Sequence, residues 1–277
     1  RFGIYAARDF LGGNGMNTDI RWRVGGISVA GFSHIEDGIP CQDAHAYKVR
    51  DDGWLVAAVS DGAGSATYSH IGAAAYVSAV VDNFCDDPNL PALSEDRISA
   101  GLIKVIDATT HKLVGNHSHD DNSSEASKSD FAATIIMIIC NENGGAFYHV
   151  GDGGGTVFEL ANLEHAVTSK PQNGEYANET YFLTMDNWQD YLRITPFEKP
   201  FDTLLLMSDG VTPMAMTKGC EAPFGSFVQP VINFLKSANP EGGLQALENT
   251  LTREQVRVVT GDDKTLFWAI ALPNTEN

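Results

Sequence analysis

The sequence predicts an α+β fold in which two antiparallel sheets are covered by helices. Between residues 131 and 168, short apolar stretches follow one another with only tight turns between them, which is typical of an antiparallel meander. Strand-like stretches also begin and end the patterned part of the chain, and helix-length segments occur in pairs between them. Because no helix follows the glycines of residues 151–155, this segment does not fit a Rossmann-type nucleotide-binding turn.

The first elements are strands joined by polar turns. Strands are predicted over residues 24–32, 44–49 and 54–59. A polar turn at residues 34–38 separates the first two, and Asp51-Asp52-Gly53 forms a hairpin turn before the third. Residues 1–20 are interpreted as a tail that derives in part from an expression tag, since Met16 follows Asn14-Gly15. Residues 21–277 are interpreted as a single domain.

Two helices are expected next. Residues 69–84 are rich in alanine and valine at helical spacing. Ser94 begins the second helix as a plain N-cap, because Arg97 stands where a capping box has Glu. Its predicted apolar face consists of Ile98, Leu102, Val105, Ile106, Thr109 and Leu113.

A polar loop is predicted at residues 115–129. It contains His117, His119, Asp120 and Asp121, and a solvated loop is favoured over a metal site.

The second half of the chain returns to strands. The meander consists of predicted strands at residues 131–140, 145–150, 155–160 and 165–168. Residues 170–195 are polar and irregular but carry several aromatic side chains, so an extended flap is expected there. A strand at 203–208, helices at 224–237 and 244–257, and a closing strand at 265–272 complete the pattern.

Composition narrows the possible functions. The 277 residues are 43% hydrophobic and carry a formal charge of -18, which argues against nucleic-acid partners and against anionic membranes. No apolar run approaches the 18 or so residues of a membrane span. The four cysteines are widely spaced without a CxxC pair, so zinc and redox motifs are absent. These features predict a cytoplasmic protein. A monomer is expected, although the sequence leaves the oligomeric state open.

Four aspartates stand at the ends of apolar strand-like stretches. Asp61, Asp152 and Asp209 each follow such a stretch and precede a glycine, whereas Asp262 follows a glycine and leads into the closing strand. A carboxylate beside a buried strand is costly unless a cation meets it. Several converging carboxylates form an oxygen-only site, which suits Mg²⁺ or Mn²⁺. The sequence therefore predicts an enzyme that uses a hard divalent metal.

The order of these segments resembles the metal-dependent serine/threonine protein phosphatases of the type 2C (PPM) family, in its bacterial branch. The resemblance runs from about Gly25 to Leu272. The segments that carry it are Cys41-Gln42-Asp43-Ala44, residues 60–65 (SDGAGS), residues 129–134 (SDFAAT), His149-Val150-Gly151-Asp152-Gly153, Ser208-Asp209-Gly210 and residues 261–265 (GDDKT). It implies a four-layer αββα sandwich and hydrolysis of phosphoserine or phosphothreonine on a phosphorylated protein substrate.

The resemblance also implies a role for individual residues. Asp61 matches the aspartate that bridges two metal ions, and the carbonyl of Gly62 matches a backbone ligand. Asp209 and Asp262 match further ligands of the first ion, and Asp43 matches the residue that holds metal-bound waters. Asp152 matches a position that binds a third, weaker ion together with Asp209. The implied cofactors are two or three Mg²⁺ or Mn²⁺ ions, and the implied nucleophile is a metal-bridging hydroxide.

Some positions depart from the family pattern. Gly38 stands where the family usually has a phosphate-binding arginine, so His34, just upstream, becomes the candidate phosphate-binding or proton-transferring side chain. Asp61, His34 and Asp43 are thus the candidate catalytic residues. Gly153-Gly154 replaces a Ser-Arg pair of the family. Asp263 stands where the family commonly has an asparagine, and at this position it is expected to support the metal ligands.

Two alternatives to this function remain. The missing arginine is compatible with a catalytically weak or inactive relative that only binds phosphoproteins. A phosphatase with an aspartate nucleophile would need a second aspartate two residues after the first, and Asp61-Gly62-Ala63 lacks it.

Overall fold

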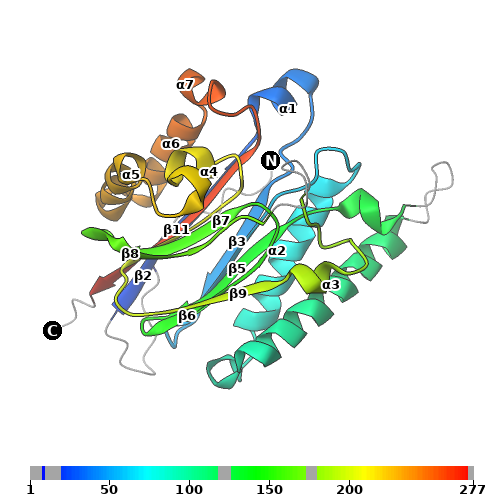
Figure 1. Ribbon diagram of the computed structural model, residues 1–277, viewed down its shortest axis with the longest axis horizontal. Coiled ribbons are helices and arrows are strands. Elements are labelled where there is room, and N and C mark those ends of the chain that lie inside the picture. The colour runs from blue at the N-terminus through cyan, green and yellow to red at the C-terminus, as the bar shows by residue number, and fades with distance from the viewer. Residues whose placement is uncertain (1–7, 10–19, 118–125, 173–179, 274–277) are drawn as a thin grey trace.

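The structure is a computed structural model that describes residues 8–9, 20–117, 126–172 and 180–273. A six-stranded sheet packs face to face against a five-stranded sheet, and helices cover the outer face of each (Figure 1). Every strand pairing in both sheets is antiparallel. The predicted αββα arrangement is confirmed.

The six-stranded sheet joins the two ends of the described chain. Its strands, in spatial order, are β1 (Arg8–Asp9), β2 (Ile20–Val29), β11 (Lys264–Pro273), β10 (Thr203–Met207), β7 (Gly154–Glu159) and β8 (Asn162–Ser169). β2 pairs with β11 over ten residues, from Ile20 opposite Pro273 to Val29 opposite Lys264. Arg8 and Asp9, which the prediction placed in a tail, form an edge strand opposite Val24 and Arg23.

The five-stranded sheet is built from the two hairpins and one later strand. Its order is β3 (Ala44–Val49), β4 (Leu55–Ser60), β5 (Ile135–Asn141), β6 (Gly144–Val150) and β9 (Arg193–Glu198). The sequence did not indicate β9, whose first residues lie within the predicted flap. β9 is an edge strand with mostly half-buried or exposed residues and a proline at Pro196, so it lacks a strong apolar pattern.

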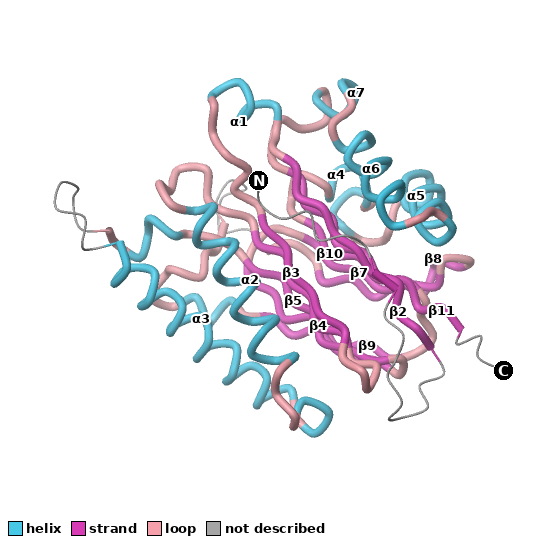
Figure 2. Tube along the Cα trace, turned by 180° about the vertical axis from the view of Figure 1, so that it is seen from behind, coloured by secondary structure: helices cyan, strands magenta, loops and turns pink. Residues whose placement is uncertain are grey.

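Two long helices cover the five-stranded sheet, and shorter helices cover the other (Figure 2). The helices on the five-stranded sheet are α2 (Ser69–Cys85) and α3 (Glu95–His117). The helices on the six-stranded sheet are α4 (Thr212–Ala215), α5 (Gly225–Ser237) and α6 (Pro240–Leu251). Short 3₁₀ turns are η1 (Leu90–Ala92), η2 (Lys128–Phe131), η3 (Trp188–Tyr191) and η4 (Lys218–Cys220).

Two further short helices, α1 (Phe32–Asp37) and α7 (Glu254–Arg257), lie beside each other at one end of the sandwich (Figure 1). The guanidinium of Arg257 lies 5.2 Å from the centre of the Phe32 ring and pairs with Glu36. α1 replaces the polar turn predicted at residues 34–38 and ends at Gly38. The predicted helix at 244–257 is two helices, because the chain turns between α6 and α7.

The N-terminus of α3 follows the prediction, whereas its C-terminus does not. The backbone N–H of Arg97 donates to Ser94 Oγ at 3.4 Å, as expected for a plain N-cap. The helix continues to His117, three residues into the predicted polar loop. Ile98, Leu102, Ile106 and Leu113 are buried, whereas Val105 and Thr109 are only half-buried.

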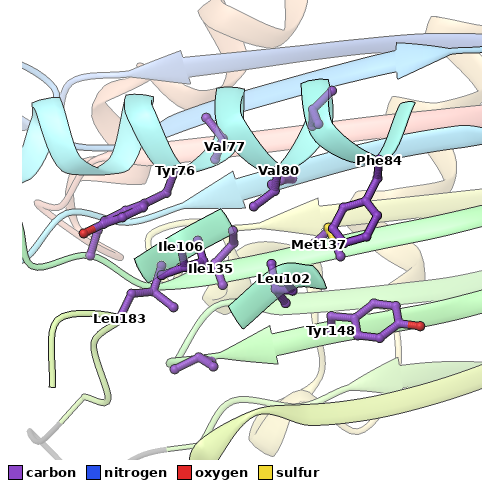
Figure 3. Close-up of a cluster of buried hydrophobic side chains, with 14 of the residues drawn as sticks. Tyr76, Val77, Val80, Phe84, Leu102, Ile106, Ile135, Met137, Tyr148 and Leu183 are labelled. Carbon is purple, nitrogen blue, oxygen red and sulfur yellow. The ribbon is translucent and has the colours of Figure 1, made fainter. Parts of the chain in front are cut away.

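The core forms three apolar clusters, one between each pair of neighbouring layers. β4 and β5 are buried on both faces: Val56 and Met137 face α2 and α3, whereas their neighbours Ala57 and Ile138 face the other sheet. Figure 3 shows Val80 and Phe84 of α2 directed toward the five-stranded sheet. This two-sided burial holds the ends of the central strands in place.

Within the described part of the chain, no helix has both the length and the apolar character that a membrane crossing requires.

We predict opposite effects for two glycine-to-alanine substitutions in the helices. A Cβ on Gly72 of α2 would lie 2.3 Å from the carbonyl oxygen of Phe131, whereas a Cβ on Gly115 of α3 would meet nothing within 4 Å. Gly72→Ala should therefore lower the free energy of unfolding by about 1–3 kcal/mol. Gly115→Ala should raise it by roughly 0.5–1 kcal/mol. Urea unfolding followed by circular dichroism measures both, and equal effects would contradict the close approach of α2 to η2.

Candidate metal centre

Three carboxylates from both sheets meet at one end of the sandwich. Asp61 directly follows β4, Asp152 follows β6 by two residues, and Asp209 follows β10 by two residues. One carboxylate oxygen from each lies within 4.8 Å of the other two. Because β4 and β6 belong to one sheet and β10 to the other, face-to-face packing of the sheets creates this cluster.

The cluster lines a cavity of about 530 Å³. The same cavity is lined by Asp262 at the start of β11, by His34 of α1, and by Gln42 and Gly62. The structure thus brings to one place all the predicted site residues except Asp43, which is not among the lining residues. Asp43 is 7% exposed and lies behind the cavity, where it accepts a hydrogen bond from Ser208 Oγ at 2.6 Å.

The donor set fits a divalent cation. Among the described residues, Oδ1 of Asp43, of Asp152 and of Asp209 is buried without a hydrogen-bond partner. A buried carboxylate oxygen without a partner is costly, and a metal ion relieves that cost by direct coordination. Hard oxygen donors of this kind suit Mg²⁺ and Mn²⁺.

Burial and mutual repulsion change the proton affinity of these carboxylates. Burial, followed by the charges of Asp43, Asp209 and Asp152, raises the pKa of Asp61 well above its ordinary value. Burial and the charges of Asp152 and Asp262 raise the pKa of Asp209 to about 6. Without a cation the cluster therefore binds protons near neutral pH.

A backbone ladder fixes the position of Asp61. The carbonyl of Asp61 accepts from the N–H of Thr134 at 2.8 Å, and the N–H of Ala63 donates to the carbonyl of Ala132 at 2.9 Å. Gly62 pairs with Ala133 in an isolated bridge between these bonds. A Cβ on Gly62 would lie 2.7 Å from the carbonyl oxygen of Gln42, so only glycine allows this approach.

Asp263 connects three segments behind the metal ligands. Its Oδ1 accepts from the N–H of Gly31 at 2.6 Å and lies 2.9 Å from His34 Nδ1. Its Oδ2 accepts from the N–H of Gln42 at 2.5 Å. Asp263 is 2% exposed, so this carboxylate holds His34, the 42–43 segment and β11 in fixed relative positions.

Sequence reasoning missed two side chains at this site. Thr180, in the predicted flap, donates its hydroxyl to Asp152 Oδ2 at 2.5 Å. Lys264 is 1% exposed, and its Nζ donates to the carbonyl of Asp262 at 2.5 Å. Burial lowers the pKa of Lys264, which is otherwise raised by neighbouring carboxylates. Thr180 lies in a segment without a periodic pattern, so no sequence signal indicated it. The one signal for Lys264 was its position directly after Asp262 and Asp263.

Other polar residues that the sequence singled out have structural roles. Asp130 accepts from the N–H and the hydroxyl of Ser127 in a capping box, at 2.8 and 2.9 Å. His149 is buried and lies 3.0 Å from Ser169 Oγ, as expected for a sheet residue. His117 ends α3, with its Nδ1 2.9 Å from the carbonyl of Leu113 and its ring against Phe131. His119, Asp120 and Asp121 lie outside the described residues.

Comparison with known proteins identifies the family. The family model "Protein phosphatase 2C" matches residues 30–252, so the chain belongs to the protein phosphatase 2C family. Serine/threonine-protein phosphatase 3 of Escherichia coli (strain K12) is 27% identical over 260 residues, covering 90% of this chain and 98% of that protein. These relationships make the protein a metal-dependent serine/threonine protein phosphatase.

Solved structures share the fold. A bacterial serine phosphatase superposes with a TM-score of 0.58 at 13% identity, over 91% of this chain and 98% of that one. The serine/threonine phosphatase Stp1 of Staphylococcus aureus superposes with a TM-score of 0.60 at 12% identity, over 94% and 99% of the two chains.

We predict that Asp209 makes the metal-free protein less stable as the pH rises. An aspartate has a pKa near 3.9 in the unfolded chain, whereas that of Asp209 in the folded protein is about 6. The folded state therefore binds more protons, so this contribution is complete below about pH 4 and is lost as the pH passes about 6. The loss should reach up to about 3 kcal/mol.

Urea unfolding in excess chelator at pH 5 and pH 7.5, for the wild type and for Asp209→Asn, measures this contribution. Between these pH values the stability of the wild type relative to the variant should fall by about 1.4 kcal/mol, because pH 5 lies one unit below the pKa of Asp209 in the folded protein. The comparison with the variant cancels the opposite contribution of the buried side chains of His45 and His149, whose pKa values are lowered by burial. Mn²⁺ should restore the stability of the wild type at pH 7.5. A difference between wild type and variant that is the same at both pH values would contradict the arrangement of the cluster.

Proposed function

We propose that the cavity around Asp61, Asp152 and Asp209 holds two or three Mg²⁺ or Mn²⁺ ions and hydrolyses phosphoserine and phosphothreonine on proteins. The observation that carries the proposal is the convergence of these three carboxylates within 4.8 Å. It gains support from the buried, unpartnered oxygens of Asp152 and Asp209 and from membership of the protein phosphatase 2C family. Mg²⁺ and Mn²⁺ are both suitable because the donors are oxygens.

Each residue at the cavity has a proposed task. Asp61, at the centre of the cluster, would bridge two ions, with the carbonyl of Gly62 as a further ligand. Asp209 and Asp262 would complete the first site, and Asp152 with Asp209 would hold a third ion. Asp43, placed behind Gln42, would orient water at the ions. When bound, such ions polarise a phosphoryl oxygen and lower the pKa of a coordinated water.

His34 is the candidate for contact with the substrate phosphate. Among the described residues that line the cavity, it is the only one with a basic side chain. Its Nδ1 lies 2.9 Å from Asp263 Oδ1, so the opposite ring nitrogen would face the cavity. A hydrogen bond from this nitrogen to a phosphoryl oxygen would take the place of the arginine that Gly38 replaces.

The alternative of an inactive phosphoprotein-binding relative rests only on the missing arginine, and no structural observation favours it. The cytoplasmic location, the monomeric state and the absence of nucleic-acid and membrane partners stay predictions.

The metal ligands are tested by changing Asp61. The protein should hydrolyse p-nitrophenyl phosphate with added Mn²⁺, and a chelator should abolish this activity. Substitution of a residue that only supports a metal ligand lowers metal affinity or activity about 10–100-fold. Because Asp61 is a proposed ligand itself, Asp61→Asn should lower kcat/KM by more than roughly 100-fold. Asp51→Asn, on the exposed hairpin turn, is the matched control and should retain activity. Calorimetric titration with Mn²⁺ should show lost or weakened binding in Asp61→Asn only.

A protein that binds Mn²⁺ yet releases no phosphate from an aryl phosphate or a phosphothreonine peptide would exclude catalysis and favour the binding-module alternative.

The task of His34 is tested separately with aryl phosphates of different leaving-group pKa. A hydrogen bond to a charged group is worth about 1.5–3 kcal/mol, so His34→Ala should weaken inhibition by inorganic phosphate roughly 10–100-fold. If His34 binds phosphate, kcat/KM falls by the same factor for every leaving group. A loss that grows with leaving-group pKa would instead assign proton transfer to His34. His165→Ala, exposed on β8, is the matched control.

A further inference from the structure

A second cavity adjoins the metal-site cavity. It measures about 480 Å³, and Ala63 and Phe182 line both cavities. Its volume lies within the range of about 300–1,000 Å³ that is usual for ligand pockets. Because Ala63 and Phe182 line both, the two cavities are neighbours, and residues flanking one whose phosphate is held at Asp61 come within reach of the second cavity.

The floor of the second cavity is rigid and made of small residues. Ala63, Ala66 and Ala132 line it, and the backbone of Ala63 is bonded to that of Ala132 in the ladder that fixes Asp61. The far wall is attached to the same ladder, since the N–H of Leu183 donates to the carbonyl of Ala133 at 2.9 Å. The cavity is therefore formed before any substrate arrives.

The wall of this cavity presents apolar side chains inside a polar rim. Met185 is 37% exposed although it is large and apolar, and its sulfur accepts a hydrogen bond from the N–H of Phe182 at 3.4 Å. Methionine adapts its shape to different partners and is frequent at binding surfaces. Lys128 of η2 and Asp186 form an ion pair beside it. Their side chains are 47% and 93% exposed, so the pair adds little stability and forms the polar rim of an interaction site.

We propose that this cavity, here called the flanking groove and lined by Ala63, Ala66, Ala132, Phe182 and Met185, binds an apolar side chain next to the phosphorylated residue of the protein substrate. The inference rests on the proposed phosphatase function. Its occupant follows from the two lining residues that the cavities share, because an extended peptide advances only about 3.3 Å per residue and a neighbouring side chain therefore lies close to the phosphorylated one. Acidic flanking side chains are disfavoured because Asp130, Asp186 and Lys128 line the groove and leave it with a net charge of about -1.

The test compares phosphothreonine peptides that differ at a single position near the phosphothreonine, where they carry leucine, alanine or glutamate. With the Mn²⁺-loaded protein, the leucine peptide should exceed the alanine peptide about 10-fold in kcat/KM at one position. The glutamate peptide should be the poorest substrate. Met185→Glu should reduce the leucine preference to below about twofold, whereas Met185→Leu should preserve it.

Hydrolysis of p-nitrophenyl phosphate provides the internal reference, because this small molecule does not extend into the groove. Both Met185 variants should hydrolyse it at the wild-type rate. Phe234→Glu serves as the matched control, since Phe234 is 49% exposed on α5 and lines a different cavity between α5 and α6. It should change neither the peptide preference nor the reference rate.

The possible failures are distinguishable. If the wild-type protein hydrolyses p-nitrophenyl phosphate but treats leucine and alanine peptides alike at every position, the flanking groove is excluded and the phosphatase function stands. A leucine preference that survives in Met185→Glu, or that is lost equally in Phe234→Glu, also contradicts the proposed role of the flanking groove. If Mn²⁺-loaded wild-type protein hydrolyses neither aryl phosphate nor peptide, the proposed function is wrong and the groove assignment falls with it.

Discussion

The repulsion among carboxylates buried between two sheets is the constraint on which the rest of the structure depends. Burial alone raises the free energy of a charged aspartate, and close neighbours of the same charge raise it further. Asp61, Asp152 and Asp209 nevertheless lie within reach of one another, because the strands that carry them are fixed by apolar clusters on both faces. The hydrophobic core thus stabilises an arrangement that is unfavourable by itself, and in the proposed function divalent ions complete it.

Rigid backbone around the cluster explains how such a site keeps its geometry. Asp61 is held by the bonds to Thr134 and Ala132, and Asp263 joins α1, the 42–43 segment and β11 through one buried carboxylate. Sites carried by strands and supported by buried hydrogen bonds keep their ligands in place before a metal or substrate binds. The same ladder forms the floor of the flanking groove, so the proposed peptide site and the proposed metal site share a common support.

Because the usual phosphate-binding arginine is missing, the basic side chain at the cavity comes from α1. The chain replaces that residue with Gly38, which ends α1, and the helix instead places His34 at the cavity. Histidine is shorter than arginine and offers fewer donors, so its orientation matters more. In the proposed site, Asp263 would supply that orientation, since its Oδ1 lies 2.9 Å from His34 Nδ1.

The sequence by itself determined the two sheets, the long helices and the aspartates that end their strands, because these depend on local periodicity and on the cost of placing a charge beside an apolar strand. It did not reveal β9 or α1, since an edge strand and a helix of six residues leave weak patterns. Only the tertiary structure showed that Thr180 contacts Asp152, that Lys264 is buried, and that Met185 and Ala63 line one groove. These contacts join residues far apart in the chain, and no local pattern encodes the packing that brings them together.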